Sequence, residues 1–535
     1  MNFLKNPKKV WYLLSLALIL FTSTVGRAQS NTAPTATNFD AISYLTSAVD
    51  TFNKRLPSEK LFVHTDKSFY TLGDTLWFKS YLFNGLTGSY ASKSGIVFLD
   101  LISDSAVVAK SISVPVFIGL SWGQITLPEE QFKEGFYTLR AYTHWMQNFG
   151  EESFFTKRIY IANPAKDHWL VSQSNAINTD AAKKNFNYSL QFKRADNQPF
   201  GYKTLQWQLN DGRKTLSRNT YEALNNTLDA SIDINTIRTP LFMRVQEKSG
   251  DRQQLSFPLL MNPSPDVDLQ FMPEGGYLVA GLPCRVAFKA LDIYGKGVNF
   301  SGVLKNSQDV KLMEFESLHK GMGSFILSPE AGENYHVLIK WGEGLSKKVE
   351  LPAPKASGTV LQVGNMASSD SLRVEVLFSG GLLDKQEYKL MGFSAGQTLF
   401  SASFKADRQR VRIRVPKQLF PSGVAHFALF NSKNEPLNER ITFINHEDNL
   451  KIEVTSSKEQ YSLRDSIPLH IRVTDANGKP VQTSLSVAVT DDSQVKADLL
   501  QENIITQTLF GSELKGHIEE PAWYLSEDSK ANEAL

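Results

Sequence analysis

The sequence predicts an all-β protein, a tandem array of β-sandwiches that follows a signal peptide and a short N-terminal helix. Apolar and polar residues alternate along most of the 535 residues, as in "TLRAYTHW" and "SLSVAVTD", and Gly, Pro, Asn and Asp bound these runs. Such alternation is typical of half-buried antiparallel strands. A chain of this length fills several cores, because a small β-sandwich needs only about 100 residues. A strand-and-turn motif also recurs at domain-length spacing.

The N-terminus has the pattern of a secretory signal peptide. Lys5, Lys8 and Lys9 precede an uncharged, largely apolar run of 12 residues, and Gly26 and Ala28 supply small residues at cleavage-site spacing. The run is shorter than the roughly 20 residues of a membrane-spanning helix, so cleavage is favoured over an uncleaved anchor. Cleavage removes four basic residues and no acidic one, which turns the net charge of +2 into −2. A nearly neutral exported chain carries no electrostatic case for nucleic acid.

Helical spacing of apolar residues occurs at two places. Six apolar residues recur every three or four positions ahead of Pro57: Phe39, Ile42, Leu45, Val49, Phe52 and Leu56. This spacing predicts one amphipathic helix before the first strand. Near the C-terminus, a weaker pattern after Ser493 predicts a second helix from four residues: Val495, Leu499, Ile504 and Leu509.

Changes in composition divide the chain into units. The predicted boundaries are 1–28 for the signal peptide, 29–57 for a linker with its helix, 58–163, 164–265, 266–356 and 357–448 for four sandwiches, and 449–535 for a fifth unit. The polar stretch 165–185 is interpreted as a linker after the first sandwich. The fifth unit looks incomplete, because it has too few strands for a closed sandwich and ends in a helix-like tail; whether the natural chain continues past Leu535 stays open.

The strand-and-turn motif repeats without a gap. The stretch "VHTDKSFYTLGDTLWF" from Val63 aligns with "VTSSKEQYSLRDSIPL" from Val454. In the first copy Tyr70 ends one strand, Gly73 can take positive φ in the turn "TLGD", and Asp74 can cap backbone N–H groups before the next strand. A partial third copy, "DIYGKG" against "DANGKP", predicts a hairpin turn. The charged, aromatic and turn-forming residues of this motif are therefore explained by its strands and turn, in preference to a ligand-binding role.

These phrases carry a resemblance. "KSFYTLGDTLWF", with "GQITLPEEQFKEGFYTLRAYT" after it, resembles the second macroglobulin domain type of the alpha-macroglobulin superfamily. "FMPEGGYLVAGLPCRVAFKALDIYGKGV" and "GKPVQTSLSVAVTDDS" are similar to later units of a bacterial branch of that superfamily. The resemblance covers nearly all of the mature chain and implies a string of fibronectin-like, seven-stranded sandwiches. Chains of this branch often continue into a segment like the plug of TonB-dependent outer-membrane receptors.

The covalent chemistry of the superfamily is missing from these residues. Some alpha-macroglobulins trap proteases through a thioester formed inside a Cys-Gly-Glu-Gln sequence. The single cysteine here, Cys284, lies in "LPCRV" within an alternating strand and is predicted to be a small buried apolar residue. One cysteine also excludes an internal disulfide framework, so the sandwiches rely on apolar cores.

Candidate catalytic and metal-binding residues each have a structural explanation that is preferred. Ser121 lies in "GLSWG", the G-x-S-x-G of a nucleophile elbow, but alternating residues and Pro128 follow it, where the elbow needs a helix. His64 and Asp66 lie on one face of a predicted strand. This spacing suits a metal ion, but the side chains of such pairs are more often solvated. No catalytic, cofactor-binding or metal-binding residue is assigned. Four aromatic residues of the first unit are predicted to be mostly core, with a minority at interfaces: Trp77, Trp122, Tyr142 and Trp145.

Two functions remain open. The first is a non-enzymatic, exported scaffold or binding protein of the bacterial cell envelope, in the periplasm or at the outer membrane, either alone or within a larger TonB-linked protein. The second is an endopeptidase inhibitor or protease trap that works without a thioester and is cut in the polar stretch 165–185. The expected partner is a protein, either a protease or an outer-membrane transport component. The scaffold is preferred, because fold-level resemblance does not determine function.

Overall fold

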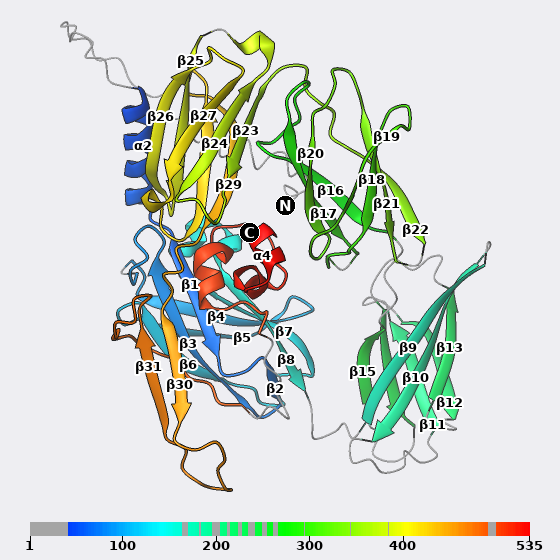
Figure 1. Ribbon diagram of the computed structural model, residues 1–535. Helices are drawn as coiled ribbons and strands as arrows, with labels where there is room; N and C mark the ends of the chain where they lie inside the picture. Colours follow the sequence, from blue (N-terminus) through cyan, green and yellow to red (C-terminus); the bar gives the residue numbers. More distant parts are fainter. Residues whose placement is uncertain are drawn as a thin grey trace, which may run out of the picture. The chain divides into compact units, whose positions relative to one another are not determined.

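The computed structural model confirms the predicted fold class: the described chain is a tandem array of small β-sandwiches (Figure 1). It describes residues 41–91, 93–162, 169–180, 183–194, 204–210, 215–222, 227–233, 241–248, 254–259, 266–293, 295–342, 344–383, 385–490 and 499–534. The signal-peptide prediction and Phe39 lie outside these residues. One amphipathic helix, α2 (Ala41–Arg55), precedes the first strand and ends just before Pro57, as the apolar spacing predicts. No helix within the described ranges has the length and apolar character that crossing a membrane requires.

The first sandwich pairs a three-stranded sheet with a five-stranded one. The strands are β1 (Glu59–Thr65), β2 (Phe69–Thr71), β3 (Thr75–Asn84), β4 (Ile96–Ser103), β5 (Val108–Pro115), β6 (Leu120–Thr126), β7 (Gly135–Tyr142) and β8 (Phe155–Ala162). The sheet orders are β1-β3-β6 and β2-β8-β7-β4-β5. Strand β2 pairs in parallel with β8, so the chain crosses from one sheet to the other and back within a few residues.

The next three sandwiches repeat one topology, three strands facing four, which is the seven-stranded arrangement expected. The second has β9 (Trp169–Asp180), β10 (Lys183–Arg194), β11 (Thr204–Asn210), β12 (Thr215–Glu222), β13 (Thr227–Asp233), β14 (Leu241–Glu247) and β15 (Gln254–Leu259). The third has β16 (Asp268–Pro273), β17 (Cys284–Leu291), β18 (Ser301–Asn306), β19 (Lys311–Glu316), β20 (Met322–Leu327), β21 (Tyr335–Trp341) and β22 (Leu345–Glu350). The fourth has β23 (Thr359–Gly364), β24 (Ser371–Phe378), β25 (Glu387–Ser394), β26 (Gln397–Lys405), β27 (Arg410–Pro416), β28 (Gly423–Phe430) and β29 (Pro436–Ile444).

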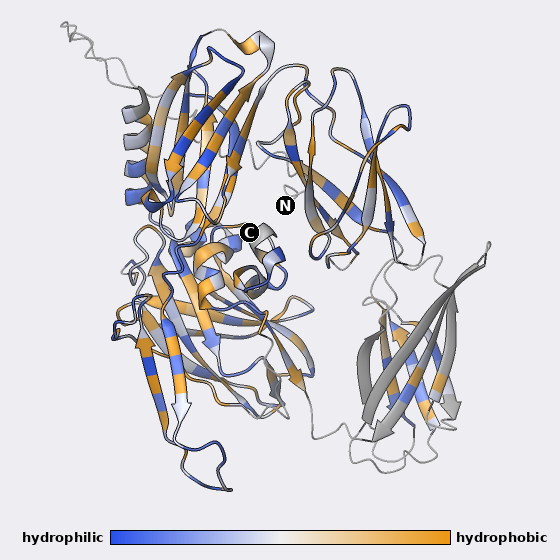
Figure 2. Cartoon of the chain, in the orientation of Figure 1, coloured by the Kyte–Doolittle hydropathy of each residue, from blue (hydrophilic) through white to orange (hydrophobic). Residues whose placement is uncertain are grey.

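In each of these sandwiches the first, second and fifth strands form the smaller sheet. The orders are β13-β10-β9, β16-β17-β20 and β23-β24-β27, and the remaining four strands of each unit form the other sheet. Hydropathy alternates along the coloured strands of the third and fourth sandwiches (Figure 2), and their buried apolar residues form the cores. In the third sandwich, for example, Phe288 is almost fully buried and packs edge-on against Phe300. A buried side chain of this size contributes up to about 3 kcal/mol, which lets the units fold without disulfides.

The polar stretch 165–185 is not a linker, which corrects that interpretation. Residues 169–180 form β9, which pairs with β10 from Trp169 opposite Arg194 to Asp180 opposite Lys183. The backbone bonds of a ladder do not depend on side-chain polarity, so a polar composition did not prevent strand formation.

The recurring motif is a strand–turn–strand element held by a buried tyrosine. Tyr70 is fully buried, and its hydroxyl donates to Asp66 Oδ1 at 2.7 Å and to the Lys67 carbonyl at 2.9 Å. The backbone N–H of Trp77 donates to the same Asp66 oxygen at 3.0 Å. Burial and the bond to Asp66 raise the pKa of Tyr70, so the hydroxyl stays a donor. One carboxylate thus joins the two sides of the turn.

The turn itself has the predicted chemistry. Gly73 has φ +87°, and Asp74 Oδ2 accepts from the Thr71 backbone N–H at 2.9 Å. The following strand buries Leu76 and Phe78. The architectural interpretation of this stretch is therefore confirmed.

The fifth unit repeats this element in the same register. Strand β30 (Lys451–Ser456) pairs with β31 (Leu469–Thr474), and Ser456 lies opposite Leu469 just as Thr65 lies opposite Phe78. Asp465 accepts from the Ser462 N–H at 2.9 Å, as Asp74 does from Thr71. At the position of Gly73 stands Arg464, with φ +70°.

The apolar face of this hairpin is open in the described part of the chain. Ile452 and Val454 are 58% and 56% exposed, whereas the equivalent Leu61 and Val63 of the first sandwich are 2% and 1% exposed. The difference arises because the five-stranded sheet covers the first hairpin, while β30 and β31 are the only strands described after residue 450. The expectation of a unit with too few strands for a closed sandwich stays a prediction, because residues 491–498 lie outside the described residues.

The described part of the C-terminal tail contains several short helical elements, the first of which begins at Ile504. Residues 491–498, which include Ser493 and Val495, lie outside the described residues. The helical part consists of α3 (Ile504–Thr506), a π-helical turn (Gln507–Gly511), a 3-10 helix (Pro521–Leu525) and α4 (Ser529–Ala534). Helix α3 starts at a capping box in which Asn503 and Thr506 bond each other's backbone N–H groups. Leu499 lies before this box, in a turn, so the predicted helix does not run without a break from Leu499 to Leu509.

Candidate binding surface and C-terminal clasp

Ser121 does not lie in a nucleophile elbow. It is the second residue of β6, it is buried, and its hydroxyl contacts that of Ser80 on the neighbouring strand. The residues after it continue the strand to Thr126. A serine presented for catalysis needs an exposed turn followed by a helix N-terminus, and this geometry offers neither.

His64 and Asp66 have separate partners. Asp66 is bonded within the turn of the motif, whereas His64 Nδ1 lies 2.7 Å from the Ser486 hydroxyl. Burial and the nearby Lys157 lower the pKa of His64, which keeps the imidazole neutral at pH 7. Within the residues that the structure describes, no three His, Cys, Asp or Glu side chains are grouped so as to hold a metal ion.

Cys284 is the buried apolar residue that the sequence predicts. It opens strand β17, is fully buried and makes only weak contacts through sulfur, to the carbonyls of Glu274 and Arg285 at 3.5 and 3.4 Å. Burial and the carboxylate of Glu274 raise the pKa of the thiol to about 12. A thiol this hard to ionise is a poor nucleophile.

The aromatic residues of the first sandwich correct another prediction. Trp77 and Trp122, expected to be mostly core, are 57% and 64% exposed, and Tyr142 and Trp145 are partly buried. The reason is strand alternation: Leu76 and Phe78 point inward from β3, so Trp77 between them points outward. The apolar alternation that predicts this strand therefore also predicts that Trp77 points outward.

The two exposed tryptophans lie on one face of the sheet β1-β3-β6. Trp122 on β6 pairs with Lys79 on β3, two residues after Trp77, so the indoles are diagonal neighbours. The turn before β6 adds Phe117 and Ile118, which are 68% and 66% exposed. We call this set, Trp77, Phe117, Ile118 and Trp122, the aromatic face. Exposed apolar surface of this kind marks interaction sites.

An extended segment of the chain already lies against the same sheet. The Lys79 ammonium donates to the Ser484 hydroxyl at 2.6 Å and to the Leu485 carbonyl at 2.8 Å. Ser486 receives a hydrogen bond from the Tyr81 hydroxyl at 2.9 Å. Burial lowers the pKa of Lys79 and raises that of Tyr81, as expected for polar groups covered by another segment. The outer surface of this sheet therefore accepts an extended polypeptide.

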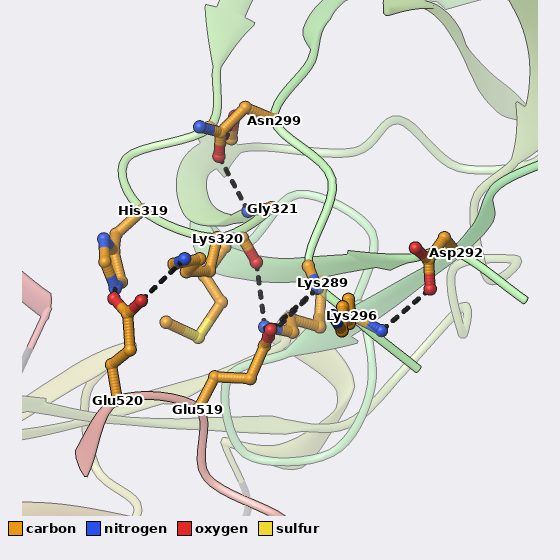
Figure 3. A network of polar contacts seen from close by, with 12 residues as sticks. Lys289, Asp292, Lys296, Asn299, His319, Lys320, Gly321, Glu519 and Glu520 are labelled. Carbon is orange, nitrogen blue, oxygen red and sulfur yellow. Dashed lines mark hydrogen bonds and ion pairs between the residues drawn. The ribbon is translucent and has the colours of Figure 1, made fainter. Parts of the chain in front are cut away.

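A second cluster is formed where the C-terminal tail meets the third sandwich (Figure 3). Both carboxylate oxygens of Glu519 accept from the Gly297 N–H at 3.0 Å, and the Lys289 ammonium lies 2.8 Å from Oε2. Lys289 also donates to the Lys320 carbonyl at 2.8 Å. Partial burial opposes ionisation, but the bonds from Lys289 and Gly297 prevail and lower the pKa of Glu519. The Glu519 carboxylate thus fixes the tail to the third sandwich, because it accepts from both a backbone N–H and a lysine side chain.

Beside this contact a histidine stacks on a tail indole. The His319 ring lies 3.6 Å from the Trp523 ring, with an interplanar angle of 9°. Glu520 pairs with Lys320 at 2.8 Å and lies 3.5 Å from His319 Nε2. Burial lowers the pKa of His319, although Glu520 partly opposes this shift.

The same tail contacts the first and fourth sandwiches. The Lys60 ammonium on β1 pairs with Glu513 at 2.5 Å and donates to the Thr508 carbonyl at 3.0 Å. Phe510 is buried, and its ring packs edge-on against Phe443 of β29. We call residues 504–525 the C-terminal clasp, because they contact three sandwiches through ion pairs and apolar side chains.

Sequence reasoning missed most residues of the clasp. Glu519, His319 and Trp523 are isolated in sequence, and no periodicity or spacing joins them. Their meeting depends on contacts between positions more than 200 residues apart. Only the apolar residues near Leu509 hinted that the tail packs against other parts of the chain.

Comparisons with known proteins give structural likeness only. No protein-family model matches the chain, and no curated protein matches it. The native form of Escherichia coli alpha-2-macroglobulin is similar over 79% of this chain and 32% of its own, at 13% identity and a TM-score of 0.32. Salmonella alpha-2-macroglobulin reacted with methylamine is similar over 78% and 32%, at 12% identity and a TM-score of 0.29.

A further solved structure, the BSP domain of a biofilm associated protein, is similar over 72% of this chain and 96% of its own, at 9% identity and a TM-score of 0.21. This chain spans about a third of the length of the alpha-2-macroglobulins that it resembles.

Proposed function

We propose that this protein is an exported, non-enzymatic scaffold that binds a protein partner at the bacterial cell envelope. The observation that carries the proposal is the aromatic face of the first sandwich. Trp77 and Trp122 are more than half exposed on a sheet whose neighbouring surface already holds the segment around Ser486. A free aromatic face costs solubility in an isolated domain, and a partner that covers it removes this cost.

The clasp adds a mechanical argument. It contacts the first, third and fourth sandwiches, so a partner held on the first sandwich is linked to the others. Export is supported by the signal-peptide pattern, and placement in the periplasm or at the outer membrane by the resemblance to the bacterial macroglobulin branch. Participation in a larger TonB-linked outer-membrane protein is part of the proposal on the same ground.

The proposal is tested by site-specific crosslinking in cells. The full chain, with a photo-reactive phenylalanine analogue at Phe117 or at Trp122, is expressed and the envelope fractions are isolated. We expect the processed chain in these fractions and one protein crosslinked from both positions. The matched control carries the analogue at Ile326, an exposed apolar residue on β20 of the third sandwich. A cytoplasmic chain, or crosslinks that are the same from all three positions, would contradict the proposal.

A second candidate, endopeptidase inhibition without a thioester, is favoured by one observation. Val487, Val489 and Leu499 are 61%, 84% and 85% exposed. They lie between two anchored points, Ser486 on the first sandwich and Thr508 in the clasp. A protease that cuts beside these side chains would separate the clasp from the segment before it, and the sandwiches would then be free to rearrange around the protease.

Incubation with endoproteases decides between the two functions. Each protease is assayed on a small peptide and on a large protein substrate after mixing with the mature chain. Loss of activity on the large substrate alone, with a cut beside Val489 or Leu499 and a retained complex, would establish a non-covalent trap. Unchanged activity on both substrates would leave the scaffold as the remaining function.

A further inference from the structure

Strand β6 is an edge strand with a free side. Among the strands that the structure describes, its one neighbour is β3, in the order β1-β3-β6. The Gly119 carbonyl accepts from the Leu82 N–H at 2.8 Å, while the Trp77 carbonyl accepts from the Asp66 N–H on the opposite side of β3. Backbone direction alternates along an antiparallel pair, so Ser121, Gly123 and Ile125 direct their backbone groups to β3. The N–H and C=O groups of residues 122, 124 and 126 therefore point to the free edge.

This edge lacks the features that normally block strand addition. The sequence of β6, "LSWGQIT", contains no charge and no proline. Strand β27 holds the same place in the fourth sandwich, in the order β23-β24-β27. Its sequence is "RVRIRVP", in which three arginines lie exposed at alternate positions and a proline ends the strand. Charged side chains and proline are the usual means by which an edge avoids unwanted pairing. The β6 edge of the first sandwich carries neither of these features.

The turn that leads into β6 is a second indication that a partner binds here. Phe117 and Leu120 exchange backbone hydrogen bonds at 2.7 and 3.0 Å around Ile118 and Gly119, which have φ +48° and +69°. Such a two-residue turn favours Asn-Gly, and a β-branched residue in the left-handed region costs about 1–2 kcal/mol. Ile118 is nevertheless present and 66% exposed. An apolar side chain that is both strained and exposed is explained when a partner covers it.

We propose that the β6 edge is the docking site for an extended, apolar segment of a partner protein, which adds to the sheet β1-β3-β6 as a fourth strand. The N–H and C=O groups of Trp122, Gln124 and Thr126 would pair with its backbone. Alternate side chains of the added strand would lie beside Trp122 on the aromatic face. This site is continuous with the surface that already binds the extended segment at Ser486.

This inference deepens the proposed scaffold function and rests on it, because it names the mode by which a partner binds. It involves backbone pairing as well as side-chain contact, and this combination separates it from other uses of the aromatic face. A lipid surface or a sugar polymer would use the indoles alone. Substitutions that alter only the backbone of β6 therefore discriminate between these occupants.

The test uses the full mature chain and a panel of eight-residue peptides in which Val, Ile or Phe alternates with Ser or Thr. The panel also contains the chain's own segment "TSLSVAVT", residues 483–490. Binding is followed by fluorescence anisotropy, and hydrogen exchange reports which amides become protected. We expect at least one peptide to bind and to protect the amides of residues 120–127. Gln124→Pro removes an outward N–H without breaking a bond to β3 and should weaken binding at least tenfold.

Two further variants keep the result interpretable. Gln124→Lys adds a charge at the edge and should also weaken binding, which covers the case that the proline variant does not fold. Ile326→Pro is the matched control: it removes an N–H at the corresponding edge of the third sandwich and should leave peptide binding unchanged.

Several outcomes would overturn the proposal. They are the absence of binding by every peptide, protection confined to residues 60–64 and 79–81, and equal binding by Gln124→Pro. Binding of phosphatidylglycerol vesicles that Trp122→Thr abolishes and Gln124→Pro does not would identify a lipid face instead. A partner that crosslinks in cells but is insensitive to Gln124→Pro would leave the scaffold function standing and sink this docking mode alone.

Discussion

Removal of the Glu519 carboxylate should release the C-terminal clasp from the third sandwich. Glu519→Ala deletes the acceptor of the Gly297 N–H and the partner of the Lys289 ammonium. Hydrogen bonds to charged groups contribute about 1.5–3 kcal/mol, and the residual exposure of this pair, 23% and 16%, favours the lower end. A loss of about 2 kcal/mol corresponds to about a 30-fold smaller docking constant.

The assay is hydrogen exchange of the backbone amides in residues 504–525, detected by mass spectrometry. These amides should exchange about 30-fold faster in Glu519→Ala, because local opening of the clasp becomes that much more frequent. Glu519→Gln retains an acceptor for Gly297 and should give an intermediate rate. Glu527→Ala, at an exposed glutamate of the same tail, should exchange like the wild type. Clasp amides within twofold of the wild-type rate in Glu519→Ala would refute the argument that this carboxylate holds the tail.

Three further predictions concern pH and the repeated turn. Burial lowers the pKa of His319 while the clasp is docked, so the undocked form takes up a proton first as the pH falls. Docking of the clasp should therefore be complete above about pH 6.5 and weaken below it. His319→Gln should remove this pH dependence from the exchange rates of the clasp amides, after correction for the intrinsic effect of pH on exchange. Tyr70→Phe should destabilise the first sandwich by about 1.5–3 kcal/mol in urea unfolding, since its buried hydroxyl donates to the carboxylate of Asp66. Tyr461→Phe in the fifth unit should have a much smaller effect, because the hydroxyl of this copy is open to solvent. Equal destabilisation by the two variants would show that the hydroxyl bonds are not the cause. Gly73→Ala should destabilise the first sandwich by about 1–2 kcal/mol through φ alone, because nothing lies within 4 Å of an added Cβ. Arg464→Gly should stabilise the fifth unit, because glycine adopts the same positive φ without strain. A stabilising Gly73→Ala or a destabilising Arg464→Gly would contradict the conformational argument.

Elements of local origin were predictable from the sequence. The alternation around Leu76 and Phe78 located strand β3, and "TLGD" located a turn with positive φ at Gly73, because these features depend on neighbours in sequence. The buried state of Cys284 followed from the same alternation. Polar composition was a poorer guide: residues 169–180 form β9, since a ladder needs backbone partners more than apolar side chains.

The binding surface and the clasp were not predictable to the same degree. Trp77 was expected inside because large aromatics contribute most to cores, yet strand alternation overrides residue preference. The contact between His319 and Trp523 joins residues 204 positions apart, and its existence depends on tertiary arrangement alone. The free edge of β6 became visible only when the order of strands in the sheet was known.

The hairpin β30–β31 has a consequence for the order of events during folding. It keeps the register of β1–β3 and the bond from the Ser462 N–H to Asp465 although no described sheet covers its apolar face. The pairing is therefore encoded by a turn of a dozen residues and does not wait for a core to close. Hairpins form in about 1–10 μs, far faster than the non-local pairings that complete a β-sandwich. In the first sandwich, the same element would be an early nucleus on which the remaining strands assemble.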